Sequence, residues 1–260
     1  ERGGEMVKEK TPHVEMKDIH KSFGNVQALR GVDFTVYENE VVGLVGDNGA
    51  GKSTLVKILT GVYQPDRGEI YYRGQRVKFS SPADAHALGI EPVHQSGATI
   101  DEISVWENFF LGRELVKDLF FIKLLDKRQM RRITQETLSK LGIELDSVDR
   151  PIGTLSGGQR QAVVIGRAVH FGGELLVLDE PTAALSLKET ERVLKYIEGV
   201  KKLGRSVILI SHLTLHVYPI ADRFVILDRG EKIGDFPKEQ ISRKELEEII
   251  VRGRMATEVH

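Results

Sequence analysis

The 260-residue chain contains no cysteine, which excludes disulfide bonds, thiolate metal sites and thiol nucleophiles and suits a reducing cytoplasm. It has no apolar run of the roughly 18 to 20 residues that span a bilayer, and its charged first ten residues, ERGGEMVKEK, lack the apolar core of a signal peptide. The net charge is -1, so no broad basic field exists to neutralise a phosphate backbone. We therefore expect a chain that does not itself cross a membrane and whose main partner is not nucleic acid.

The pattern of apolar residues predicts an α/β protein. With 40% apolar residues, the chain can fill the core of one large α/β domain with a lobe, or of two small domains. Short alternating runs predict strands between residues 13 and 45 and a hairpin over residues 70–79. Continuous apolar runs predict buried parallel strands over residues 174–179, 206–211 and 223–228. Helical spacing predicts helices over residues 51–60, 126–141, 188–203 and 243–251, and Ser81 followed by Pro82 predicts a further helix start.

A glycine-rich loop, GDNGAGKS, follows the predicted strand Val41–Val45 and opens the predicted helix of residues 51–60. It fits G-x-x-x-x-G-K-[ST], in which backbone N–H groups surround phosphate oxygens, the lysine adds a point charge and the hydroxyl reaches Mg²⁺. The sequence therefore predicts a nucleotide site. Its residues are Gly46, Asp47, Asn48, Gly49, Ala50, Gly51, Lys52, Ser53 and Thr54.

Two adjacent acids end one of the predicted buried strands. Asp179 and Glu180 follow the apolar run LLVL, at the carboxyl edge of the sheet where ligands bind in doubly wound folds. A carboxylate neutralised by Mg²⁺ accepts a proton poorly, so the two acids should divide the work. We assign Asp179, with Ser53, to the metal, and Glu180 to the water that attacks the γ-phosphate.

A second short motif, LSGGQ, places Ser156, Gly157, Gly158 and Gln159 at a predicted helix N-terminus. Unpaired amides and the helix dipole favour an anion there. Since one bound nucleotide needs only the first loop, this second phosphate-binding end predicts that another copy of the protein supplies it in a head-to-tail dimer.

These motifs, in this order, resemble those of the nucleotide-binding subunit of ATP-binding cassette transporters. The resemblance covers about residues 13 to 250 and implies a P-loop NTPase (RecA-like) core with an antiparallel β subdomain and an inserted helical lobe. It further implies ATP and Mg²⁺ as cofactors and ATP hydrolysis as the activity. By resemblance, Gln95 contacts Mg²⁺ and the membrane subunit, His212 is the switch histidine beside Glu180, and Phe23 stacks on adenine.

The implied domain comprises a core of residues 13–95 and 154–250 and a helical lobe of about residues 96–153. Residues 1–12 are expected to be disordered, and residues 251–260 to form a tail. The apolar run Leu119–Leu125 lies in the lobe, where the family docks a coupling helix; packing within the lobe is an equal alternative. One departure from the family pattern is Ser186, which occupies the place of a frequent aspartate and puts coupling between two ATP sites by that residue in doubt.

The runs SSPADAHALGIEPVHQ and SVWENFFLGREL and the region following LSGGQ look most similar to ATPases of bacterial ribose, xylose and fructose importers. That similarity implies import of a monosaccharide through an integral membrane permease, supplied indirectly by a periplasmic or surface sugar-binding protein. It also implies a cytoplasmic location on the inner face of the membrane, and either a homodimer or pairing with a second cassette. The alternatives are a soluble cassette ATPase that acts on nucleic acid or ribosomes, an exporter subunit, and a non-hydrolysing ATP sensor.

Overall fold

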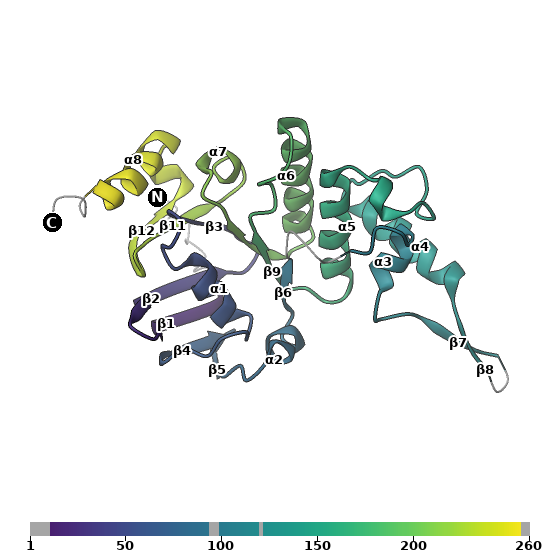
Figure 1. Ribbon diagram of the computed structural model, residues 1–260, viewed down its shortest axis with the longest axis horizontal. Coiled ribbons are helices and arrows are strands. Elements are labelled where there is room, and N and C mark those ends of the chain that lie inside the picture. Colours follow the sequence, from purple (N-terminus) through teal and green to yellow (C-terminus); the bar gives the residue numbers. More distant parts are fainter. Residues whose placement is uncertain (1–10, 94–98, 120–121, 256–260) are drawn as a thin grey trace, which may run out of the picture.

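A mixed six-stranded sheet forms the centre of the protein, in a computed structural model that describes residues 11–93, 99–119 and 122–255 (Figure 1). Its strand order is β12-β11-β3-β10-β9-β6, and all neighbours are parallel except β12 with β11. The strands are β3 (Val41–Val45), β6 (Ile90–Val93), β9 (Leu175–Asp179), β10 (Ser206–Ile210), β11 (Arg223–Asp228) and β12 (Glu231–Pro237). The predicted buried parallel strands are confirmed.

Side chains of the central strands alternate between two apolar cores. On β3, Val41 and Val45 enter one core, whereas Val42 and Leu44 enter the other. Strands β9, β10 and β11 divide their residues in the same way, because successive side chains of a strand point to opposite faces. Both faces of the sheet are therefore covered, which explains why these strands read as continuous apolar runs.

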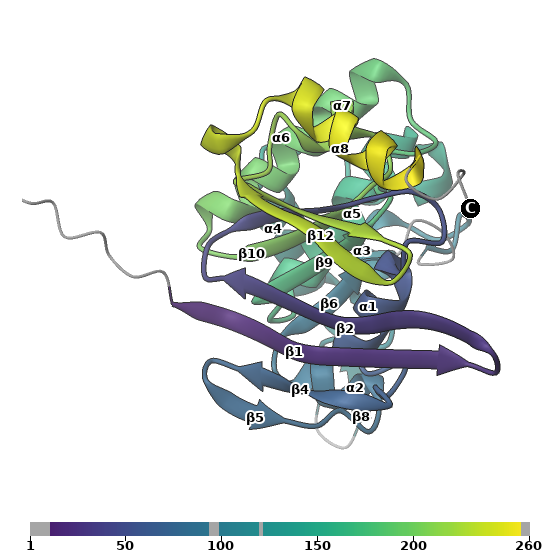
Figure 2. The ribbon, with the colours of Figure 1, turned by 90° about the vertical axis from the view of Figure 1, so that its left-hand side faces the viewer.

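A four-stranded antiparallel sheet covers one side of the molecule, as Figure 2 shows. Its order is β2-β1-β4-β5, from β1 (Pro12–Phe23), β2 (Val26–Tyr37), β4 (Arg67–Tyr72) and β5 (Gln75–Val77). Helix α1 (Lys52–Leu59) buries Leu55, Ile58 and Leu59 in the core that this sheet shares with the six-stranded sheet. The predicted antiparallel β subdomain thus packs directly on the helix that begins at the glycine loop.

The remaining helices supply the second core and the lobe. They are α2 (Pro82–Ala87), α3 (Val105–Phe110), α4 (Lys127–Lys140), α5 (Gly157–His170), α6 (Leu187–Lys202), α7 (Thr214–Val217) and α8 (Arg243–Met255), with 3₁₀ turns at Ile152–Thr154 and Lys238–Gln240. Serine caps at the starts of α2, α3, α5 and α6 each form a capping box with an acidic or amide residue three positions on. Among the described residues, no helix is both long and apolar enough to cross a lipid bilayer.

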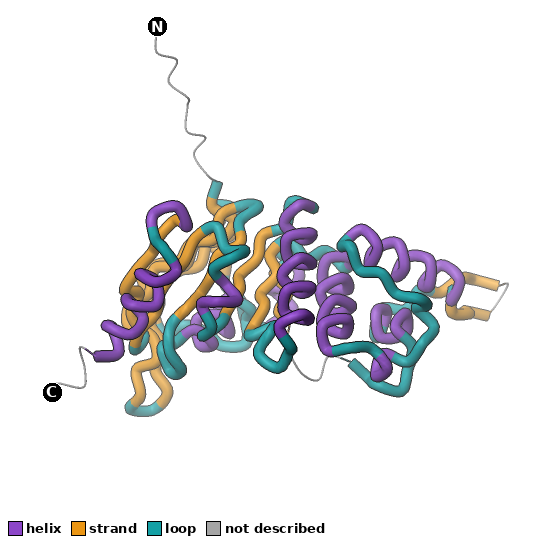
Figure 3. Tube along the Cα trace, turned by 90° about the horizontal axis from the view of Figure 1, so that it is seen from above, coloured by secondary structure: helices purple, strands orange, loops and turns teal. Residues whose placement is uncertain are grey.

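The lobe predicted to be helical also contains a β-hairpin. Strands β7 (Val116–Leu119) and β8 (Ile122–Leu125) pair antiparallel and project from the end of the molecule, next to α4 (Figures 1 and 3). Helical patterns alone were expected here, because a continuous apolar run does not distinguish strand from helix by its period. Leu124 and Leu125 are 42% and 44% exposed, so part of the surface of each side chain remains open to a partner.

The ends of the regular structure differ slightly from the predicted limits. β1 begins at Pro12, one residue before the predicted start of the domain, and Thr11 accepts a hydrogen bond from the Glu38 N–H. Helix α8 continues to Met255, so residues 251–255, expected to be tail, are helical.

Candidate nucleotide site

Glycines shape the loop between β3 and α1. Gly46 has a φ of 143°, and a Cβ there would lie 2.1 Å from the Leu227 carbonyl oxygen. Gly51 has a φ of 102°, and its Cβ would lie 2.8 Å from the Ala28 oxygen. A Cβ at Gly49 would meet nothing within 4 Å, so that residue faces open space. Two of the glycines are thus required by close packing against neighbouring strands, and the third leaves the loop open to a ligand.

Helix α1 presents its N-terminus to this open space. Gly51 is its N-cap and offers no side-chain acceptor to the first N–H groups. No acidic residue occupies its first turn. The helix end therefore keeps the unpaired donors and partial positive charge that bind phosphate.

Lys52 folds back over the loop. Its Nζ donates hydrogen bonds to the carbonyl oxygens of Gly46, at 2.7 Å, and Asp47, at 2.8 Å. Burial lowers the pKa of this amine, and the negative charges of Glu180, Asp47 and Asp179 partly offset that effect. The hydrogen-bond acceptors of this cation are two uncharged carbonyl oxygens, and a phosphate would compensate its buried charge better.

The carboxyl ends of neighbouring strands bring the acids to the loop. β10 pairs in parallel with both β3 and β9, and Ile210 lies opposite Asp179. A cavity of about 460 Å³ is formed there. Its lining includes the predicted residues Asn48, Gly49, Ala50, Gly51, Lys52, Ser53, Thr54, Asp179 and Glu180. The structure thus joins the two halves of the site that the sequence placed more than a hundred residues apart.

Other residues of this cavity were missed by sequence reasoning. Val26, Gln27, Ala28 and Arg30 come from β2, and Arg229 comes from the turn between β11 and β12. The N–H of Arg30 donates to the Gly230 carbonyl, and the Gly230 N–H donates to the Ala50 carbonyl. No local motif marks these positions; a basic residue at a strand-connecting turn, as at Arg229, is the only available signal.

Glu180 is held by the residues that follow β10. Its carboxylate accepts hydrogen bonds from the Ser211 hydroxyl, at 3.0 Å, and from the His212 N–H, at 2.9 Å. The His212 imidazole Nδ1 lies 2.7 Å from the same carboxylate, which makes it a donor. Glu180 itself has a φ of 49°, a left-handed conformation that a glutamate rarely adopts. The predicted pair of Glu180 and His212 is therefore in direct contact, and Ser211 is a third member that the sequence did not reveal.

A magnesium ion fits the oxygen donors of this cavity. Ser53, in the first turn of α1, and Asp179, at the end of β9, both line it. Hydroxyl and carboxylate oxygens are the ligands that Mg²⁺ prefers, and it takes few of them from the protein. Among the described residues, no group of three or more histidine, aspartate or glutamate side chains could hold a metal on its own.

The LSGGQ turn forms the start of α5, as predicted, but lies outside this cavity. Ser156 is the N-cap: its hydroxyl accepts from the Gln159 N–H, and the Gln159 side chain accepts from the Ser156 N–H. The Gly158 N–H lies 3.5 Å from a carboxylate oxygen of Glu189. None of these turn residues is among those that line the cavity of the same chain.

Ser186 caps helix α6. Its hydroxyl accepts from the Glu189 N–H and donates to the Glu189 carboxylate, at 2.8 Å. An aspartate at an N-cap would also accept from the helix, so this position keeps the capping function without the charge. The structure therefore gives Ser186 a definite local role in its own chain.

Of the other predicted residues, Gly46, Asp47 and His212 lie next to lining residues without lining the cavity themselves, and Gln95 and Phe23 are not placed in it. Gln95 lies outside the described residues. Phe23 ends β1 and is 42% exposed, with its ring edge-on to Tyr63 at 5.2 Å between centroids. Val26, which pairs with Phe23 across the β1–β2 hairpin, does line the nucleotide cavity. The roles of Gln95 and Phe23 stay predictions.

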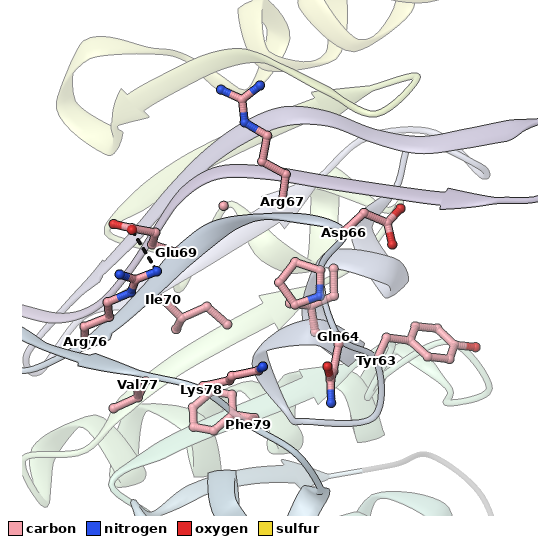
Figure 4. Close-up of a pocket in the computed structure, with 13 residues that line it drawn as sticks. Tyr63, Gln64, Asp66, Arg67, Glu69, Ile70, Arg76, Val77, Lys78 and Phe79 are labelled. Carbon is pink, nitrogen blue, oxygen red and sulfur yellow. Dashed lines mark ion pairs between the residues drawn. The ribbon is translucent and has the colours of Figure 1, made fainter.

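Tyr63 also borders a separate cavity of about 490 Å³, shown in Figure 4. It lies between the segment that follows α1 and the β4–β5 hairpin, and an ion pair of Glu69 with Arg76, at 2.9 Å, closes one edge. No predicted catalytic or nucleotide-binding residue lines it.

Comparisons with known proteins agree with this geometry. The sequence profile of a family described as "ABC transporter" matches residues 29–183. A xylose/arabinose import ATP-binding protein of Sulfolobus acidocaldarius is 43% identical over 237 residues, which cover 91% of this chain and 93% of that protein. A ribose import ATP-binding protein of Caldanaerobacter subterraneus is 40% identical over 240 residues, 92% of this chain but 48% of that protein. The chain thus spans nearly all of one relative and about half of the other.

A solved structure has the same fold. It is the ADP conformation of an ATP-binding cassette of an ABC transporter, with a TM-score of 0.81 at 26% identity, over 94% of this chain and 98% of the other.

Proposed function

Because the chain belongs to the ABC transporter family, as the resemblance of its motifs predicted, we propose that it is the ATP-hydrolysing subunit of an import system for a monosaccharide. The observation that carries the proposal is that one cavity brings these groups together. Lys52, the first turn of α1 and Glu180 all line it, and His212 contacts the Glu180 carboxylate. Two relatives whose names specify sugar import support the substrate class.

The triphosphate would occupy the open end of α1. The loop amides and Lys52 supply donors and charge, and phosphoryl transfer requires mainly such positioning and charge neutralisation. When bound, Mg²⁺ would neutralise charge on the phosphate oxygens, and Ser53 and Asp179 are the residues that would hold it.

Glu180 would act on the attacking water. Its carboxylate lines the cavity, and hydrogen bonds from Ser211 and His212 fix its orientation. A water that contacts a free lone pair of this carboxylate would be polarised toward the γ-phosphate. His212 would hold the carboxylate in that orientation.

The position of the LSGGQ turn supports a head-to-tail dimer. Ser156, Gly157 and Gly158 form a helix end suited to an anion, yet they do not line the cavity of their own chain. In a two-fold dimer each turn would face the nucleotide of the other chain, so that two ATP molecules are buried at one interface. A second cassette could take the place of the identical copy.

Transport requires further subunits. We infer an integral membrane permease that docks on this chain at the inner face of the membrane, and a sugar-binding protein on the far side that never touches it. The β7–β8 hairpin belongs to the lobe where members of the family dock a coupling helix of the membrane protein. Its Leu124 and Leu125 are exposed, so we infer that this hairpin is part of the docking surface. A soluble cassette that acts on ribosomes or nucleic acid is not favoured, because both relatives are named for import.

The test has two stages. Purified protein with Mg²⁺ and ATP should release phosphate, and Lys52→Ala should not. Co-reconstituted in vesicles with its permease, it should drive uptake of a labelled pentose or hexose only when ATP is on the side of this chain. Absence of phosphate release by the complete complex in the presence of sugar-loaded binding protein would refute the proposal.

A further inference from the structure

The carboxylate of Glu189 connects two helix starts. One oxygen accepts from the backbone N–H and the hydroxyl of Ser186, at 3.1 and 2.8 Å, and so caps α6. The other lies 3.5 Å from the Gly158 N–H, at the start of α5. A single side chain therefore supplies an anion to two positive helix ends.

The packing of α5 on α6 brings this carboxylate to the LSGGQ turn. A Cβ at Gly158 would lie 3.2 Å from the Glu189 Cβ, and a Cβ at Gly157 would lie 2.6 Å from the Leu185 side chain. Gly158 thus lies close against the first turn of α6, and Gly157 lies against the Leu185 side chain that precedes that helix. Hydrogen bonds from Ser186 and Gly158 lower the pKa of Glu189 to about 2, so the group is an anion at neutral pH.

The following proposal rests on the function proposed above. We propose that the Glu189 carboxylate accepts a hydrogen bond from the Gly158 N–H in the free protein, and that a phosphate of the partner's ATP replaces the carboxylate as the acceptor when the dimer forms. The carboxylate then sets how tightly the ATP-bound dimer closes. The contact with Gly158 is long and easily given up, whereas the two hydrogen bonds with Ser186 keep the carboxylate nearby. Its negative charge would therefore continue to oppose the triphosphate after the amide has changed partners.

The experiment measures the dissociation constant of the ATP-dependent dimer by sedimentation, in a Glu180→Gln parent that binds ATP without rapid turnover. Glu189→Gln keeps an oxygen for the capping box with Ser186 but removes the charge and the acceptor for Gly158. We expect the dimer to become about two- to fivefold tighter at low salt, from the usual size of helix-end charge effects. The gain should shrink at high salt, because salt screens exposed charges.

A matched control is available on α8. Ser242 and Glu245 form the same capping box, with hydrogen bonds of 2.8 and 2.6 Å from the N–H and hydroxyl of Ser242, and no second helix end is bonded to Glu245 among the described residues. Glu245→Gln should leave the dimer constant unchanged, and thermal unfolding of the two single variants should show a similar loss from the weakened cap.

The outcomes separate the two proposals. A Glu180→Gln, Glu189→Gln dimer that is unchanged or weaker, while its parent dimerises with ATP, overturns the role of Glu189 alone. A gain that does not depend on salt also overturns it, because the effect would then not be electrostatic. A Glu180→Gln parent that stays monomeric with saturating ATP overturns the proposed dimer and this inference together.

Discussion

The His212 imidazole lies 2.7 Å from the Glu180 carboxylate, and the backbone N–H of His212 donates to the same oxygen. Two donors from one residue fix the direction of this carboxylate at the end of the central sheet. The contact joins β9 to the segment that follows β10, so a shift of either strand end would change the aim of the carboxylate.

Glu180→Gln should therefore lower ATP turnover by about 10²- to 10⁴-fold, the usual contribution of a positioned general base, and leave ATP affinity nearly unchanged. Steady-state phosphate release and equilibrium ATP binding measure the two quantities. Glu69→Gln, at an exposed ion pair of the four-stranded sheet, is the control and should keep full turnover. If Glu180→Gln hydrolysed ATP as fast as the wild type, Glu180 would have no role in the mechanism.

Lys52→Ala should weaken ATP binding by about 10- to 100-fold, because one charge-assisted hydrogen bond to the phosphates is lost. The free protein should still fold, since burial of this cation lowers its pKa and thus disfavours its charged form. Lys57→Ala changes an exposed lysine of the same helix and serves as the control. Fluorescent-nucleotide titration gives the affinities, and circular dichroism checks the fold. An affinity equal to that of the wild type contradicts the role of Lys52.

The sequence predicted the centre of the nucleotide site because its determinants are local. A glycine loop between a strand and a helix, and acids at the end of a parallel strand, meet at the same sheet edge whatever the rest of the chain does. Arg30 and Arg229 reach the cavity only through the packing of β2 and the β11–β12 turn on the loop, which no local pattern encodes.

Glu189 also makes one contact that the sequence predicts and one that depends on packing. The pattern Ser186-x-x-Glu189 is a visible capping box, so the start of α6 could be predicted from it. Its second contact, to Gly158, depends on how α5 packs on α6 and is not contained in the pattern. The β7–β8 hairpin was missed because its apolar run has no period of its own.

The absence of cysteine makes the head-to-tail dimer directly testable. In the Glu180→Gln background, Asn48→Cys places a thiol on the glycine loop, and Ser156→Cys places one on the LSGGQ turn. A mixture of the two variants with ATP and a short bis-maleimide should yield a cross-linked dimer, whereas each variant alone should not. Cross-linking within a single variant would indicate a head-to-head arrangement, and cross-linking without ATP would show that nucleotide does not bring the chains together.

A final prediction concerns pH and a histidine far from the nucleotide. His13 is buried between the two large sheets, where its Nδ1 lies 3.0 Å from the Ser206 hydroxyl and its Nε2 lies 3.4 Å from the Tyr72 hydroxyl. Burial, and to a smaller extent the charge of Arg73, lower its pKa from 6.5. Burial also lowers the pKa of His170, beside Phe109 and Phe110.

Because the folded-state pKa lies below the unfolded one, the unfolded chain binds more protons as the pH falls below 6.5. The contribution of His13 to stability is complete above that value and is lost as the pH falls through the folded-state pKa. The free energy of unfolding in urea should thus decrease from pH 7 to pH 5. His13→Asn keeps a polar atom for Ser206 but does not titrate, so it should be less stable at pH 7 by about 1 kcal/mol and show a shallower decrease. His170→Asn should flatten the slope further in the double variant, and a His13→Asn slope equal to that of the wild type would show that His13 is not the buried titrating group.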